Sequence, residues 1–218
     1  MKGARVLFGA AAAAFVLAPA VTPARGITDI GLHAGVNTSR FGRHSSDVDP
    51  RMGFSIGPYV AYGIADRLGV QAELLYTQKG GTLTSTWWDK WYTDHGVMDF
   101  LPGGLPRDPV DVSLAYAELP ILARITLPGT RWVRPYVILG PSAAVRIHGG
   151  PRYAGIGPHL PQIRKSDMSL VFGGGACVSL GAHDLHVGAR YAHGVTAVSE
   201  DLGRNVVWSL EVGYGYRL

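Results

Sequence analysis

The feature that most constrains the fold is a two-residue alternation of apolar with small or polar side chains. Gly53–Ala65 illustrates it: Phe54, Ile56 and Val60 share one face, while the other face carries mainly glycine, serine and alanine. Successive side chains of a β-strand point to opposite faces, so a period of two predicts strands. No segment of the sequence has the period of a helix, and we expect an all-β protein.

The same alternation predicts eight strands. Most of these segments are longer than the usual globular strand of about 5–6 residues. They match or exceed the roughly 9–11 residues with which a tilted strand crosses a bilayer. The predicted strands are Asp29–Asn37, Gly53–Ala65, Leu68–Lys79, Ser113–Leu127, Val133–Ile147, Asp167–Gly181, Leu185–Tyr191 and Val206–Leu218.

Short and long connections alternate between these strands. The turns at 65–67, 128–131 and 181–184 are tight, whereas the connections at 38–50, 80–112, 148–166 and 192–205 are long. Outer-membrane barrels have short periplasmic turns and longer extracellular loops. The pattern therefore predicts an eight-stranded antiparallel up-and-down transmembrane β-barrel. An even number of strands would place both termini on the periplasmic side.

The amino terminus has the properties of a secretory signal peptide. Lys2 and Arg5 precede an apolar stretch that is too short to span a membrane, and small residues then allow cleavage after Ala20 or Ala24. We expect residues 1–24 to be removed and 25–218 to form the barrel domain. Without residues 1–24 the formal net charge falls from +4 to +2, because both basic residues leave with them. A nucleic-acid partner is not expected at that charge.

The composition excludes other classes. With 47% hydrophobic and 17% charged residues, the chain is too apolar to be disordered, and its single cysteine rules out a disulfide scaffold. After the first 21 residues no apolar run approaches the ~20 residues of a membrane helix. A soluble, lipocalin-like periplasmic barrel remains an alternative, because it also alternates but has an apolar lumen.

Aromatic residues on the apolar face favour the membrane barrel over the soluble one. They fall at two levels with aliphatic residues between them, as the two interfaces of a bilayer select. Glycines on the polar face would leave room inside a barrel of only eight strands. The expected girdles consist of Tyr76, Tyr191 and Trp208 near the outer ends of their strands, and Tyr62, Tyr214 and Tyr216 near the periplasmic ends.

The polar face carries charged residues near the middle of several strands. Unpaired charges in a narrow lumen are costly, so we expect a nearly complete network that fills the barrel and leaves no open pore. Closure brings the first strand beside the last, which places His33 close to Arg190 and Glu211. The network is expected to pair Arg190 with Glu211, and to neutralise Glu73 and Glu118 with Arg124, Arg146 or Arg190.

Several motifs resemble the PorT-like outer-membrane β-barrel family of Bacteroidetes-type bacteria. The resemblance covers nearly the whole mature chain and implies an eight-stranded barrel in the outer membrane, without a settled biochemical activity. The last residue, Leu218, differs from the Phe with which that family usually ends. The matching stretches are 31–37 (GLHAGVN), 71–80 (QAELLYTQKG), 116–122 (YAELPIL), 135–137 with 140–141 (PYV, GP), 188–191 (GARY) and 213–218 (GYGYRL).

The long second outer loop carries the strongest candidate for a binding site. Trp87, Trp88, Trp91 and Tyr92 could stack on sugars or anchor in lipid headgroups, or they could fold back onto the rim and order the loop. No metal site is expected, since His183 and His186 straddle a turn and Asp47 and Asp49 lack further ligands.

We therefore expect an integral, non-enzymatic outer-membrane protein without a cofactor, surface-structural or binding a ligand or partner through its extracellular loops. Its expected partners are outer-membrane lipid and, during insertion, the barrel assembly machinery; the external ligand is left open. The rival function is a lipid-modifying hydrolase, which would need Ser85, Asp94 and His95 to converge at the outer rim. Cys177 is expected to face the lumen as structural filling.

Overall fold

The computed structural model describes residues 26–42, 47–95, 109–151 and 163–218. The proposed signal peptide lies outside the described residues, as do parts of three outer loops. The strands are β1 (Gly26–Phe41), β2 (Val48–Ala65), β3 (Leu68–Glu73), β4 (Leu75–Leu83), β5 (Val110–Thr126), β6 (Val133–Pro151), β7 (Ser166–Leu180), β8 (His183–Ser199) and β9 (Gly203–Arg217).

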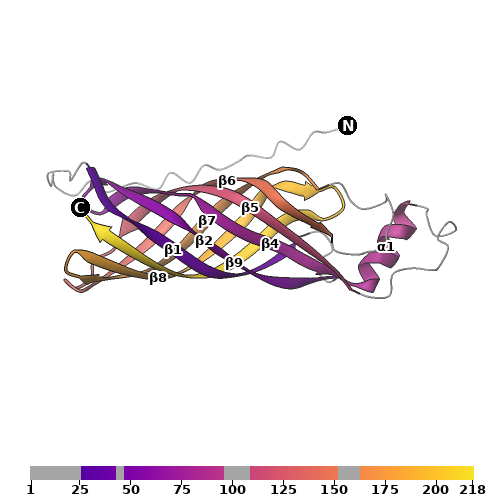
Figure 1. Ribbon diagram of the computed structural model, residues 1–218, viewed down its shortest axis with the longest axis horizontal. Helices are drawn as coiled ribbons and strands as arrows, with labels where there is room; N and C mark the ends of the chain where they lie inside the picture. The colour runs from indigo at the N-terminus through magenta and orange to yellow at the C-terminus, as the bar shows by residue number, and fades with distance from the viewer. Residues whose placement is uncertain (1–25, 43–46, 96–108, 152–162) are drawn as a thin grey trace, which may run out of the picture.

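These strands form one closed antiparallel barrel (Figure 1). Strands β5 to β9 each pair with their neighbours in the chain, and β3 and β4 both pair with β2 and β5. β1 pairs with both β2 and β9, which removes the free edges. β3 and β4 occupy a single strand position in the barrel, interrupted only at Leu74, whose N–H still donates to the carbonyl of Pro58. Each such strand position is called a wall below. The barrel therefore has eight walls, and the expected eight-stranded up-and-down topology is confirmed.

The strands reach further than the alternation predicts toward the end with the long connections, which is called the outer end below after the expected orientation. The connection expected at 192–205 is only 200–202, because β8 and β9 continue as a paired hairpin to Ser199 and Gly203. Backbone pairing, unlike alternation, needs no apolar face, so it extends beyond the apolar part of each strand. The strict alternation of short turns and long loops is thus wrong at this connection.

The distribution of side chains is inverted relative to a soluble protein. Leu32, Val187 and Leu210 point outward and are 58%, 60% and 66% exposed, while Glu73 and Lys79 are 2% exposed inside the barrel. An apolar outer wall around a polar lumen is the arrangement of a membrane barrel. A lipocalin-like barrel would have the opposite arrangement, so that alternative is not favoured.

A helix, α1 (Ser85–His95), follows β4 at the end of the barrel opposite the carboxyl terminus (Figure 1). The expectation that no segment is helical is therefore wrong for this loop. Three tryptophans at positions i, i+1 and i+4 bring apolar side chains to one side of this helix. Within the described residues, no helix is both long and apolar enough to cross a membrane.

Candidate functional site

The centre of the lumen is crossed by an ion-pair network around Arg190. Its guanidinium donates two hydrogen bonds of 2.6 Å to the two carboxylate oxygens of Glu73, and its Nε lies 2.5 Å from Glu211. His33 completes the group, with Nδ1 3.3 Å from both Glu73 and Arg190. The expected neighbours Arg190, Glu211 and His33 are thus together, and Glu73 takes its counter-charge from Arg190.

Glu118 belongs to a second polar group, nearer α1, which the sequence analysis did not predict. The ammonium of Lys79 lies 3.0 Å from Glu118 and 3.9 Å from Asp167, and Ser142 donates a 2.7 Å hydrogen bond to Glu118. Lys79 is 2% exposed. The alternation could have identified Lys79, because it lies an even number of residues from Gln71 and Glu73 and therefore shares their inward face.

Of the three arginines expected as alternatives, Arg190 supplies the counter-charge of Glu73. Arg146 makes no ion pair with Glu73 or Glu118 within the described part of the chain. It lies on the inward face of β6 but two residues nearer the outer end than Ala144, which stands opposite Glu118. Arg124 makes no ion pair with Glu73 or Glu118 among the described residues, and it reaches the central network through Gln71, whose side-chain amide donates to Glu73. It hydrogen-bonds Gln71 and His186, at 3.0 and 3.3 Å, near the turn end of the lumen.

A layer of aromatic and histidine rings separates the central network from the turn end. His33 stacks on Tyr59 with ring centroids 4.2 Å apart, and the Tyr59 hydroxyl lies 3.0 Å from Nε2 of His186. The same hydroxyl donates to Asp29 at 2.9 Å. Glycines make room for these rings: a Cβ on Gly213 would lie 2.2 Å from the His33 ring, and one on Gly215 would lie 2.2 Å from the Tyr59 hydroxyl.

The turn end of the lumen contains a cavity of about 250 Å³. Arg134 and Arg217 both bond Asp184 there, Arg134 at 2.7 Å, and Arg217 also donates to Ser179. Cys177 is buried and accepts a 3.4 Å hydrogen bond from Arg134. Its expected position facing the lumen is correct.

Cys177, Asp184 and His186 bring three potential metal-ligand atoms within 4.8 Å of one another, a cluster that the sequence analysis did not anticipate. Each of these atoms already faces a guanidinium, from Arg134, Arg217 or Arg124. Three fixed positive charges oppose a bound cation, so the surroundings of this cluster do not fit a metal site.

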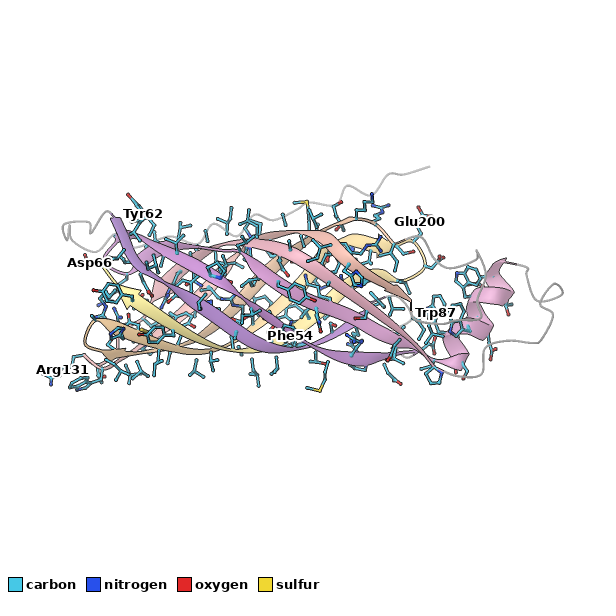
Figure 2. The ribbon with its side chains drawn as sticks, viewed as in Figure 1. Phe54, Tyr62, Asp66, Trp87, Arg131 and Glu200 are labelled. Atoms are coloured by element: carbon cyan, nitrogen blue, oxygen red, sulfur yellow. The ribbon has the colours of Figure 1, made fainter. Side chains whose placement is uncertain are left out.

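At the outer end the lumen is filled by apolar side chains and closed by α1. Trp88 is fully buried and Trp87 is 2% exposed, so both fold back onto the barrel instead of being available for stacking on a ligand. Figure 2 shows Trp87 at the junction between α1 and the strands. The cluster comprises Phe41, Val48, Leu83, Trp87, Trp88, Val110, Val112, Leu114, Tyr116, Ala144, Val198 and Leu202, with Trp91 packed against it.

Of the two alternatives expected for these aromatic residues, Trp87 and Trp88 therefore follow the second, folding back onto the barrel. Trp91 is partly buried and stacks on Trp87, with centroids 6.4 Å apart. The side chain of Tyr92 lies outside the described part of the structure. Lys90 ties α1 to the rim through a 2.5 Å ion pair with Asp47.

The residues of the rival hydrolase do not converge. Ser85 and His95 are the first and last residues of α1, which places them about 15 Å apart along the helix axis. Asp94 is adjacent to His95 at the far end. A nucleophile and its base must come within hydrogen-bond reach, which this helix does not allow.

The aromatic residues of the expected girdles lie on the outward face. At the outer level, Tyr191 contacts Trp208 and Phe172, with centroids 4.7 and 5.1 Å apart, while Tyr76 contacts Phe54 at 5.5 Å. Near the turns, Tyr214 and Tyr216 flank His183, and Tyr62 lies at the same end (Figure 2). Along β9, Trp208 and Tyr216 are separated by about 20 Å of barrel height if the strand is tilted by roughly 40°.

Comparison with known proteins identifies this architecture. The family model described as "outer membrane protein beta-barrel domain" matches residues 25–200. Among solved structures, Neisserial surface protein A is 16% identical, with a TM-score of 0.53 over 88% of this chain and 99% of that one. OprG from Pseudomonas aeruginosa is 13% identical, with the same TM-score over 89% and 97%. No curated protein matches the sequence.

Proposed function

Because the chain belongs to the family of the outer membrane protein β-barrel domain, we propose that it is a closed, non-enzymatic barrel of PorT-like type. It presents α1 and the neighbouring loops at the cell surface, where they act as a structural or partner-binding element. The observation that carries this proposal is the double closure of the lumen, by the Arg190 network at the centre and by the tryptophan cluster at the outer end.

Closure argues against transport through the resting barrel. The Arg190–Glu73 pair joins opposite walls, so a solute passing along the lumen would have to break a charge pair in which both partners are buried. It would also have to displace Trp88 and its neighbours, which pack without exposed surface.

The positions of the short turns and of α1 support an orientation of the barrel in the membrane. The turns at 66–67, 181–182 and the carboxyl terminus share one end, and α1 with the longest connection lies at the other. In barrels of this class the longer loops face outward. We therefore assign α1 to the cell exterior and both termini to the periplasm, with signal peptide removal and the barrel assembly machinery preceding insertion.

Conductance tests the closure. The protein reconstituted into planar bilayers is expected to show no steady ohmic current, and the control Lys90→Ala should behave the same because Lys90 lies outside the lumen. Trp87→Ser/Trp88→Ser removes the outer obstruction only, so the central network should still keep the current near baseline. A steady wild-type conductance would contradict the proposed closed state.

Cysteine labelling tests the orientation, in a Cys177→Ser background. Asp89→Cys on α1 should react with a membrane-impermeant maleimide on intact cells, because Asp89 is exposed at the outer end. Asp66→Cys, at the opposite end (Figure 2), should react only after the outer membrane is permeabilised. The reverse pattern would refute the assigned orientation.

A further inference from the structure

The cavity at the turn end of the lumen is rich in arginine. Its charged lining side chains are four arginines and three aspartates: Arg67, Arg124, Arg134, Arg217, Asp29, Asp66 and Asp184. Leu218, the last residue, also lines it and adds the negative charge of its carboxylate. Asp66 and Arg67 are adjacent on an exposed turn and offset each other. Asp29 faces the layer of rings: it accepts a hydrogen bond from the Tyr59 hydroxyl, and Nε2 of His186 lies 3.3 Å from its carboxylate. On the inner wall, three arginines therefore have one carboxylate side chain between them, that of Asp184.

Arg124 is the arginine whose charge no carboxylate offsets. Its partners are the side-chain oxygen of Gln71, the ring nitrogen of His186 and the face of Tyr136, whose centroid lies 4.3 Å from its Cζ. None of the ion pairs among the described residues includes Arg124. Neutral partners orient a guanidinium without supplying a counter-ion, and a half-buried arginine beside a cavity is a suitable anion ligand.

Arg134 and Arg217 add further donors beside the same cavity. The two guanidiniums share one carboxylate, that of Asp184, through their terminal nitrogens. One carboxylate balances only one of the two guanidinium charges. Both side chains keep about a third of their surface exposed, so their terminal N–H groups can also donate to an oxyanion in the cavity.

We propose that this cavity binds a small soluble oxyanion, a phosphate or carboxylate group, through Arg124 with support from Arg134 and Arg217. Guanidinium groups bind such oxyanions through paired N–H···O bonds. The volume of about 250 Å³ suits a small molecule. Arg124 lies inside the barrel, where it bonds Gln71 and His186, so we assign the ligand to solution and not to the headgroup of a membrane lipid.

A titration with inorganic phosphate tests the proposal. The barrel in detergent micelles is followed by the NMR signals of the arginine Nε–H groups, with sodium chloride adjusted to hold the ionic strength constant. The signals of Arg124, Arg134 and Arg217 are expected to shift saturably, whereas that of Arg131 should not. Arg131 stacks on Trp132 at the same end but outside the cavity. Succinate in a second titration should compete with phosphate, because both present oxyanions.

Substitutions test whether phosphate binds in this cavity. Arg124→Gln should weaken phosphate binding by about tenfold or more, since charge-assisted hydrogen bonds are lost. Arg124→Lys keeps the charge and should retain part of the affinity, and the control Arg131→Gln should bind as the wild type does. Heat-modifiable gel mobility verifies that each variant is folded. Shifts that chloride reproduces at equal ionic strength, or binding unchanged in Arg124→Gln, would overturn the proposal.

Discussion

Arg190 and Glu73 join opposite walls of the barrel through two hydrogen bonds of 2.6 Å each. Arg190 lies on β8 and Glu73 on β3, and three other walls separate these strands on either side of the ring. The pair therefore acts across the whole width of the lumen. Because both side chains are almost fully buried, it links the stability of the barrel to the closure of its lumen.

Breaking this pair on one side should be strongly destabilising. Arg190→Met leaves Glu73 and Glu211 buried without their cation, which is expected to cost about 3–5 kcal/mol of unfolding free energy. The triple variant Arg190→Met/Glu73→Leu/Glu211→Leu should recover part of that loss, since no unpaired charge remains. Denaturant unfolding in micelles measures both. Lys90→Ala is the matched control: its ion pair with Asp47 is half exposed, and its loss should cost less than about 1 kcal/mol.

Trp88→Ala should loosen the outer closure while the strands remain paired. Trp88 is fully buried among the apolar residues at the barrel mouth, and removing a side chain of this size costs about 3–5 kcal/mol of local packing. Limited proteolysis should then cut within α1, while gel mobility still reports a folded barrel. Thr86→Ala, at an exposed position of the same helix, should leave α1 protected. Equal protection of both variants would disprove the proposed role of Trp88.

Gly213→Ala should impair folding because the lumen has no room for a methyl group at this position. A Cβ there would lie 2.2 Å from the His33 ring, far inside van der Waals contact. His33 is also held by Glu73 and by the stack on Tyr59, so it cannot move freely. The folded fraction after refolding into micelles is the measurement. Gly26→Ala is the control, since nothing lies within 4 Å of the added atom, and a normal yield of Gly213→Ala would contradict this account.

Leu210→Arg tests which surface faces lipid. Leu210 points outward on β9 between the levels of Trp208 and Tyr214, where an arginine near the bilayer midplane should cost about 2–4 kcal/mol. Leu180→Arg is equally outward but lies at the end of β7, where the cost should fall to roughly 0–1 kcal/mol. Unfolding from phospholipid vesicles measures the difference. Equal costs at the two depths would argue against a bilayer around this part of the wall.

Much of the barrel wall could be predicted from the sequence. The alternation in segments such as Gly53–Ala65 separated lipid-facing from lumen-facing residues correctly, because a side-chain period of two is a local property of every strand. The pairing of Arg190 with Glu211 was also predictable, since these residues lie on strands that follow one another in the chain.

The apolar filling of the outer lumen and the helix were not predictable in the same way. Val110, Val112 and Leu114 share the inward face of β5 with Glu118, so the inner face changes from polar to apolar along one strand. The tryptophans beyond β4 indicated a binding loop as readily as a cap. Only their burial against strands distant in sequence distinguishes the two.

By itself the sequence determined the number of walls, the lipid-facing surface and the residues that face inward, because these depend on parity within single strands. The tertiary structure alone decided which inward charges meet: Glu73 with Arg190, Glu118 with Lys79, and Arg124 beside an open cavity instead of a carboxylate. The physical reason is closure. The stagger of the strands around the ring sets the height of each residue in the lumen, and charges on opposite walls pair only where those heights coincide.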